Sequence, residues 1–480
     1  MPDVFVLGSK MEETMLIRFS FKNFKSVGLE PVTLEMVSSA KVRKLKGHVC
    51  TSSKEAKILR NAVVYGGNAA GKSTLYKAFA FMKVAVMGGG LPQDGIREYC
   101  RCGEGHAEEE SSFDIQFETE GRVFDYGFSC ILAKMHVTSE WLYSLGGDAK
   151  PLFLRDGGSS IDCSGVRETA DDADVARLDV YADDFCHDQS ETMGSGLFLS
   201  YMGKGRSFSD DSALDAFRRA FTWFDAGIET IGVNQRASST EYYTESSTLD
   251  QVAEVLSSFD TGISGLRKEE VGMDELDKIV PPEIRFTITE LLKANAPKRD
   301  SDTFGLTIRN ENFFVGIERE GAGEPKATVL RTRHGGSLLA FDFQDESDGT
   351  RRLFDFMDIL FTQSEDKVFM IDELNRSFHP MLTQHLVELF NQVHANDDCQ
   401  LVFTTHENDI MSYEYFRRDE IWFVERDEEG LSRLYPLDDF ATDGARSDAR
   451  LNKKYLEGRY GGVPVIDLSR ARAALNVREA

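Results

Sequence analysis

The sequence has no run of 18 or more apolar residues, and its first residues, Met1–Ser20, lack the basic and then apolar order of a secretion signal. We therefore expect no membrane-spanning segment and a cytoplasmic protein. Cysteine is also scarce, with seven residues scattered from Cys50 to Cys399 at no repeated spacing. An odd, scattered set does not form a disulfide framework and fits a reducing compartment.

Clusters of metal-ligating residues are equally rare. Cys100, Cys102 and His106 lie close together in the sequence, but no second pair follows at the spacing of a zinc site. Free thiols on a glycine-rich loop are therefore the favoured interpretation, and we predict no structural metal there.

Basic residues are fewer than acidic residues. The chain has 55 Lys and Arg against 81 Asp and Glu, a formal net charge of -26, so its average surface would repel a phosphate backbone. Nucleic acid could bind only at a local patch, and the best one is Lys41–Lys46 (KVRKLK), although short basic runs are usually solvated loops. The net acidity instead favours a protein partner with a basic face.

The pattern of apolar residues predicts a mixed α/β protein. With 480 residues, the chain is long enough for two or three units with buried cores. Residues 146–175 are rich in Gly, Asp and Ser and predict a loop, whereas 212–292 contains several helical stretches. Strands are predicted at the following ranges: 15–21, 32–36, 58–65, 113–117, 122–128, 304–318 and 327–331.

A glycine-rich loop supplies the strongest chemical signal. It matches G-x-x-x-x-G-K-[ST] in full, between a predicted strand and a predicted helix over 71–87, with Thr74 following it. Its residues are Gly66, Gly67, Asn68, Ala69, Ala70, Gly71, Lys72 and Ser73. Such a loop turns successive backbone N–H groups toward phosphate oxygens, so we predict that Lys72 reaches the β- and γ-phosphates and that the Ser73 hydroxyl binds Mg²⁺.

Two later apolar strands end in polar residues. Residues 368–371 lead into Asp372 and Glu373, and residues 401–405 lead into His406, with a predicted helix between them. By itself an apolar strand that ends in Asp-Glu is weak evidence, and a solitary histidine is usually structural. Combined with the glycine loop, the pattern predicts Asp372 in the Mg²⁺ shell, Glu373 beside the attacking water and His406 against the γ-phosphate.

A further motif precedes the amphipathic helix predicted at 350–360. Ser347, Asp348, Gly349 and Thr350 place a hydroxyl and a glycine at a helix start. The residues alone leave two interpretations equally open, a second phosphate-binding tip or an ordinary helix cap.

In combination and order these motifs resemble the ABC-type ATPases of the SMC and RecF group. The strings at 372–380, 404–406, 417–423 and 455–462 more narrowly resemble the bacterial AAA15 family, which includes the ATPase subunits of AbiL (RloA-like) and PARIS anti-phage systems. The likeness spans about 16–87 and 341–464. It implies an SMC/RecF-like ATPase head with a mixed central sheet, an antiparallel β-subdomain and a helical insertion.

The resemblance further implies that two heads meet face to face around ATP. Ser347 and Gly349 of one copy would close over the nucleotide of the other, with Asn375 at the seam. The tip reads Glu-Ser-Asp-Gly-Thr instead of Leu-Ser-Gly-Gly-Gln, so the resemblance implies nucleotide binding but not efficient turnover. The glutamine that usually joins the Mg²⁺ shell is not identifiable, and Gln116 is only a weak candidate.

On this basis we predict three parts: residues 1–145 with the glycine loop, a loop-rich and helical insertion at 146–300, and the remaining part of the head at 301–480. The leading hypothesis is a regulatory ATPase of an abortive-infection system, which holds or releases a separate effector nuclease in response to a phage-derived trigger. The alternative is a RecF-like DNA-repair ATPase that binds duplex DNA. A transporter's nucleotide subunit is disfavoured, because such subunits are usually shorter.

Overall fold

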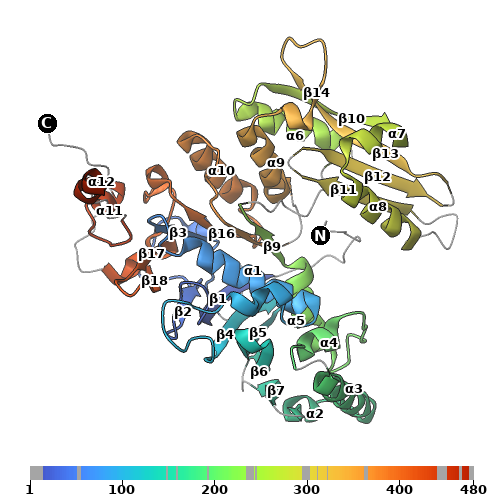
Figure 1. Ribbon diagram of the computed structural model, residues 1–480, viewed down its shortest axis with the longest axis vertical. Helices are drawn as coiled ribbons and strands as arrows, with labels where there is room; N and C mark the ends of the chain where they lie inside the picture. The colour runs from blue at the N-terminus through green and yellow to red at the C-terminus, as the bar shows by residue number, and fades with distance from the viewer. Residues whose placement is uncertain are drawn as a thin grey trace. The chain divides into compact units, whose positions relative to one another are not determined.

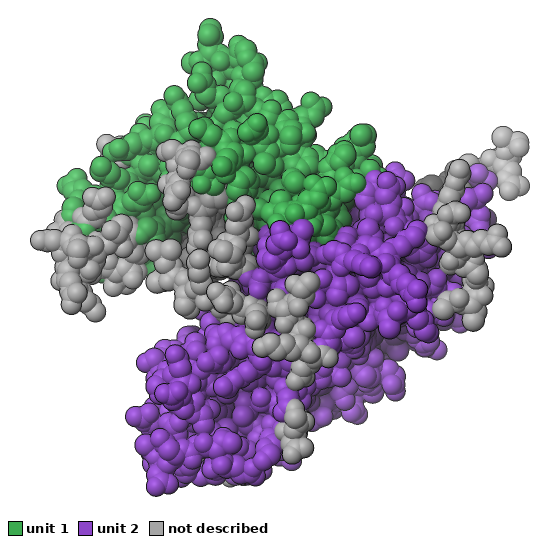
Figure 2. All heavy atoms as spheres, turned by 180° about the vertical axis from the view of Figure 1, so that it is seen from behind, with its two compact units in different colours: residues 1–10, 229–365, 376–393 green, residues 11–228, 366–375, 394–480 purple. Residues whose placement is uncertain are grey.

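The protein is described from a computed structural model (Figure 1). It describes residues 14–50, 56–146, 150–157, 160–191, 194–233, 243, 246–294, 303–310, 312–321, 323–361, 366–440, 451–463 and 468–474. Contacts divide the chain into two compact units, which Figure 2 colours separately. Unit 1 comprises residues 1–10, 229–365 and 376–393, and unit 2 comprises residues 11–228, 366–375 and 394–480. Each unit is therefore assembled from three separate stretches of sequence.

A six-stranded mixed sheet among the described residues carries the candidate site. Its strand order is β18-β17-β3-β16-β15-β9. Strands β17, β3, β16 and β15 pair in parallel, and β18 is antiparallel to β17. The bounds are β3 (Asn61–Gly66), β9 (Ile228–Ile231), β15 (Val368–Ile371), β16 (Gln400–Thr405), β17 (Ile421–Arg426) and β18 (Ser432–Pro436). Every residue of β3, β15 and β16 is buried, which explains why these strands read as continuous apolar runs.

Unit 2 also contains an antiparallel sheet whose order is β2-β1-β4-β5-β6-β7-β8 among the described residues. Its strands are β1 (Met15–Lys22), β2 (Val32–Glu35), β4 (Ser111–Thr119), β5 (Arg122–Ile131), β6 (His136–Leu145), β7 (Lys150–Asp156) and β8 (Ile161–Asp162). Buried and partly exposed residues alternate along β4, as expected for a sheet with one apolar face. The main core joins this face to α1 (Lys72–Gly88), for example through the edge-to-face rings of Phe19 and Phe79.

The prediction that residues 146–175 form a loop was wrong. Strands β7 and β8 lie in this range, as do α2 (Ser164–Arg167) and the start of α3 (Asp172–Glu191). Strand β7 forms because it pairs with β6, with Trp141 opposite Leu154, a non-local contact that local composition does not reveal. Two further helices of unit 2 are α4 (Phe198–Gly203) and α5 (Asp215–Ala226).

Unit 1 is built on a third sheet, in which the described strands follow the order β10-β13-β12-β11 and β14 pairs with β13. The strands are β10 (Ile263–Val271), β11 (Thr303–Arg309), β12 (Phe314–Glu320), β13 (Lys326–His334) and β14 (Phe341–Asp342). The helices are α6 (Ser246–Ser258), α7 (Met273–Ile279), α8 (Pro282–Ala294), α9 (Asp348–Phe361) and α10 (Pro380–Val393). A separate apolar core packs α7 and α8 against this sheet.

The expected α/β class, with a mixed sheet and an antiparallel subdomain, is confirmed by these pairings. The sequence division at 145 and 300 remains a proposal; β7, β8, β9 and β10 all come from the stretch predicted to be an insertion. Near the C-terminus the described helices are α11 (Leu451–Leu456) and α12 (Leu468–Ala474). No helix among the described residues is long and apolar enough to cross a membrane.

Candidate nucleotide site

The loop between β3 and α1 contains two residues in the left-handed conformation. Ala69 and Gly71 have left-handed backbone angles, with φ of 62° and 115°. A Cβ atom on Gly71 would lie 2.2 Å from Ser432 Oγ, so both the angle and the space require glycine. The Ser432 hydroxyl in turn donates to the carbonyl oxygen of Ala70 at 2.6 Å. The loop is thus fastened to β18, at the edge of the same sheet.

Lys72 points back into this loop. Its Nζ atom donates to the carbonyl oxygens of Gly66 at 2.7 Å and Gly67 at 3.0 Å, and lies 3.1 Å from Nδ1 of His406. The residue is only 5% exposed. Burial lowers the pKa of Lys72 to about 8, although Glu373 and Asp372 oppose the shift by favouring the charged amine. A cation is therefore held where the loop's backbone would meet phosphate oxygens.

Asp372 and Ser73 form a pair of oxygen ligands. The Ser73 hydroxyl donates to Asp372 Oδ1 at 3.2 Å. Adjacent ligands of an octahedral Mg²⁺ ion, each about 2.1 Å from the metal, lie about 3.0 Å apart, so this spacing suits that ion. Hydroxyl and carboxylate oxygens are also the ligand types that Mg²⁺ prefers. The residues present therefore fit a magnesium ion.

One buried hydroxyl positions both acidic residues. Thr404, in β16, donates to Asp372 Oδ1 at 2.7 Å and accepts from the backbone N–H of Glu373 at 2.8 Å. Glu373 has a left-handed backbone, with φ of 53°, which is unusual for a residue other than glycine, asparagine or aspartate. The Thr404 bond therefore fixes a backbone turn that would otherwise be disfavoured.

Glu373 and His406 face each other at the ends of neighbouring strands. His406 Nε2 lies 3.4 Å from Glu373 Oε1. Burial first and Lys72 second lower the pKa of His406, against the opposing effect of Glu373, so the ring is neutral at pH 7. Because Nδ1 faces the Lys72 ammonium, which only donates, we assign the ring proton to Nε2, which faces the carboxylate.

Asn375 lies at the same C-terminal end of the parallel strands. Its Oδ1 atom accepts from the Thr405 hydroxyl at 3.0 Å and faces the His406 backbone N–H at 3.4 Å. The structure thus brings the predicted residues Lys72, Ser73, Asp372, Glu373 and His406 together with Asn375 in one unit, as the parallel strand order requires.

The predicted tip belongs to unit 1, where it begins α9. The Ser347 hydroxyl accepts from the Thr350 backbone N–H at 3.1 Å, which is the geometry of a helix cap. A Cβ atom on Gly349 would lie 2.8 Å from the Ser377 carbonyl oxygen. Gln116, the weak candidate for the metal shell, instead donates to Asp125 Oδ2 on the neighbouring strand at 2.7 Å.

Sequence reasoning missed three residues that brace the site: Thr404, Ser26 and Ser432. Ser26 Oγ lies 2.8 Å from Thr74 Oγ1 and 2.8 Å from Ser432 Oγ. These bonds join the opening loop, the start of α1 and β18. A signal existed only for Thr404, since polar residues at the end of an otherwise apolar strand stand out in the sequence.

A second set of metal-ligating side chains lies elsewhere in unit 2. His394, Asp397 and Cys399 bring a nitrogen, a carboxylate oxygen and a sulfur within 4.8 Å of one another. His394 Nδ1 is already 2.8 Å from Asp397 Oδ2, and the Arg60 guanidinium lies 3.5 Å from the same carboxylate. Burial raises the pKa of the Cys399 thiol well above its usual range. These contacts join the segments that precede β3 and β16, and we interpret the set as structural rather than as a metal site.

The geometry defines the class of the protein. A lysine-bearing phosphate loop whose sheet ends in Asp-Glu on one strand and His on the next is the arrangement of ABC-type P-loop ATPases, and the chain has an ATP-binding domain of this class. More particularly, it belongs to the family described as "AAA domain, putative AbiEii toxin, Type IV TA system", whose model matches residues 62–412. No curated protein sequence matches the chain.

Three similar solved structures have low sequence identity and low TM-scores. The Smc head domain with an extended coiled coil, bound to the C-terminal domain of ScpA and derived from Pyrococcus furiosus, is 11% identical with a TM-score of 0.38, covering 89% of this chain and 98% of that one. The SMC head domain from Thermotoga maritima is 12% identical with a TM-score of 0.30, covering 88% and 98%. RecF-ATP of the RecFOR pathway is 12% identical with a TM-score of 0.32, covering 88% and 98%. The fold assignment therefore rests on the sheet order and the site.

Proposed function

We propose that the protein binds and hydrolyses ATP, and that it uses this cycle to control a separate toxic effector, a nuclease, in bacterial anti-phage defence. The observation that carries the ATPase part is the position of His406 between Lys72, at 3.1 Å from its Nδ1, and Glu373, at 3.4 Å from its Nε2. These three side chains follow three neighbouring parallel strands, β3, β15 and β16, and we assign each a role in phosphoryl transfer.

In the proposed reaction, the backbone N–H groups of residues 66–73 and the Lys72 ammonium bind the β- and γ-phosphates. Mg²⁺, held by Ser73 and Asp372, would neutralise phosphate charge. Glu373 accepts a proton from the attacking water, since its carboxylate is fixed at the sheet edge beside His406. His406 then offers a neutral N–H group, which can bond a γ-phosphate oxygen or Glu373 according to the nucleotide present.

We further propose that two copies close around ATP, with Ser347 and Gly349 of one copy facing the phosphates bound by the other. The support is the start of α9, where Ser347 and Asp348 are exposed and Gly349 is half-buried, as a phosphate-binding helix N-terminus requires. Ser347→Asp would keep the helix cap but place a carboxylate against phosphate, so it should prevent ATP-dependent dimerisation while leaving ATP binding intact.

Light scattering with and without Mg-ATP tests this assembly. The parent protein is the Glu373→Gln variant, which should bind ATP but hydrolyse it slowly, and Ser347→Asp is added to it. Ser257→Asp, at an exposed position of α6 in the same unit, is the matched control and should dimerise normally. A Ser347→Asp protein that dimerises as its parent does would contradict the proposed tip.

The defence role rests on the family description, which names a toxin of a toxin–antitoxin system, and on the narrower resemblance to the AAA15 family. Purification from the native operon should recover a neighbour-encoded nuclease whose association depends on ATP. An ATPase that purifies without any such partner would remove this part of the proposal. A DNA duplex that binds in an ATP-dependent and salt-sensitive way would instead favour the DNA-repair alternative.

A further inference from the structure

The basic segment Lys41–Lys46 stands out in an acidic protein. Lys41, Arg43, Lys44 and Lys46 are all exposed. None of the four forms an ion pair with any other residue of the described ranges, whereas the chain as a whole carries a net charge of -26. Unpaired cations gathered in six residues create a local field of opposite sign to the rest of the surface.

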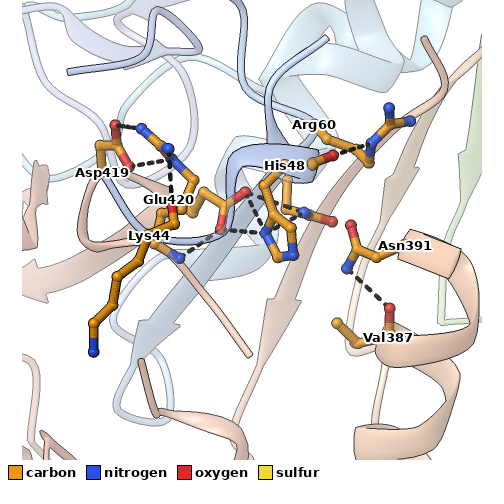
Figure 3. Close-up of polar contacts among 10 residues, drawn as sticks. Lys44, His48, Arg60, Val387, Asn391, Asp419 and Glu420 are labelled. Atoms are coloured by element: carbon orange, nitrogen blue, oxygen red, sulfur yellow. Dashed lines mark hydrogen bonds and ion pairs between the residues drawn. The ribbon is translucent and has the colours of Figure 1, made fainter. Parts of the chain in front are cut away.

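A buried polar clamp holds the segment in one conformation. The clamp consists of five buried residues: His48, Asn61, Arg417, Asp419 and Glu420. Figure 3 shows its bonds, with the labelled Lys44 side chain extending away from them. The Arg417 guanidinium donates two hydrogen bonds to the Asp419 carboxylate, of 3.0 and 2.8 Å. Its third nitrogen donates to the Lys44 carbonyl oxygen at 3.1 Å.

Both ends of the segment are tied to the same short turn. Before it, the Ser39 backbone N–H donates to Asp419 Oδ2 at 2.7 Å. After it, His48 Nδ1 lies 2.9 Å from Glu420 Oε2, and the Asn61 amide donates to Glu420 Oε1 at 3.0 Å. Within it, Leu45 is held at a φ of 48°. Among the described residues, Asp419 and Glu420 form ion pairs with Arg417 and His48 and not with the four cations.

From these contacts we propose that Lys41–Lys46 is a docking surface for an acidic segment of a partner protein. A fixed loop loses little conformational freedom on binding, so four cations on it attract a short acidic strand more strongly than a flexible run would. Steering by such a patch also speeds association at low salt.

Nucleic acid fits the surface less well. A duplex buries on the order of 1,000 Å² of protein and contacts phosphates on either side of a short loop, where it would meet the net acidic surface of this chain. The segment also has no aromatic residue on which single-stranded bases could stack. A short acidic peptide covers the loop alone.

The proposal goes beyond the proposed ATPase function and does not depend on it. The clamp residue Asn61 and the phosphate-loop residue Gly66 are at opposite ends of β3, about 17 Å apart at the rise of an extended strand. Docking can therefore be measured whether or not the protein hydrolyses ATP.

The test uses the full-length protein, a fluorescein-labelled oligoglutamate peptide and a labelled DNA duplex, by anisotropy over a range of salt. Neutralising Lys41, Arg43, Lys44 and Lys46 together to Gln should weaken peptide binding about tenfold or more. The control neutralises Lys134, Lys150, Arg433 and Lys453, four other exposed cations, and should bind the peptide as the parent does.

Arg417→Lys tests the clamp, because it keeps the net charge but cannot grip Asp419 and Lys44 together; it should weaken peptide binding several-fold. Peptide binding that is absent, or equal in the parent and the quadruple variant, would overturn the docking surface. Duplex binding that is lost in the quadruple variant without any peptide binding would assign the surface to nucleic acid instead. Lys72→Ala should bind the peptide normally, which separates this result from failure of the ATPase proposal.

Discussion

The Nζ atom of Lys72 lies 3.1 Å from Nδ1 of His406, although the two residues are 334 positions apart in the chain. Burial lowers the pKa of His406 most, and the Lys72 cation lowers it further. Since Lys72 retains a pKa of about 8 while the pKa of His406 is lowered, the lysine is the cation of the pair at neutral pH. The relationship predicts how ATP affinity responds to pH.

ATP affinity should fall as the pH rises through about 8. The free site must carry a protonated Lys72 to bind phosphate, and bound phosphate raises the pKa of the amine, so above pH 8 binding must take up a proton. The dissociation constant should therefore rise by up to about tenfold per pH unit. Titration calorimetry from about pH 7 to about pH 9 measures it. Residual binding by Lys72→Arg should not change over this range, because the guanidinium stays charged.

Glu373→Gln should bind ATP with parental affinity but hydrolyse it about 10² to 10⁴ times more slowly, because the amide cannot accept the proton from water. Lys72→Ala should lose both binding and hydrolysis. A fluorescent ATP analogue reports binding, and phosphate release reports turnover. Hydrolysis by Glu373→Gln at the parental rate would show that Glu373 is not the base.

Thr404→Val should slow hydrolysis with little change in ATP affinity, because the bond that orients Glu373 is lost while Lys72 and the glycine loop remain. The Glu373 N–H loses its partner and Asp372 Oδ1 keeps only the Ser73 hydroxyl, which should also cost about 1 to 3 kcal/mol of stability. Thr404→Ser keeps the hydroxyl and should recover most of the parental turnover. If Val and Ser behave alike in both turnover and urea unfolding, the hydroxyl does not position the acids.

Gly66→Ala should disrupt the loop through crowding alone. Its Cβ atom would lie 2.5 Å from the Val424 carbonyl oxygen of the neighbouring strand, and a backbone atom cannot move aside without separating β3 from β17. We expect a stability loss of about 1 to 3 kcal/mol and weakened ATP binding. Gly88→Ala, at the end of α1 with no atom within 4 Å of the new Cβ, should instead stabilise the protein by about 0.5 to 1 kcal/mol. Thermal unfolding with and without ATP compares the two.

Much of the nucleotide site could be predicted because its signals are local. The helix predicted at 71–87 is observed as α1 at 72–88. The apolar run at 368–371, directly before Asp372, is observed as strand β15. The role of Thr404 could not be predicted in the same way, because its bond to Asp372 spans 32 residues and depends on the register of β15 against β16. The Ser26–Ser432 contact spans 406 residues. Side-chain contacts of this kind follow from the finished sheet rather than from either segment alone.

Interleaving of the two units has a consequence for synthesis on the ribosome. Strand β3 pairs only with β16 and β17 in the described sheet. After Ser73 is synthesised, 299 more residues must be added before its partner Asp372 exists. At translation rates of about 5 to 20 residues per second, that interval is about 15 to 60 s. During this interval the backbone N–H and C=O groups at the two edges of β3 have no native partner and its apolar side chains are not yet covered. The nascent chain therefore needs protection from aggregation, and a cell that stops translating early produces no working nucleotide site.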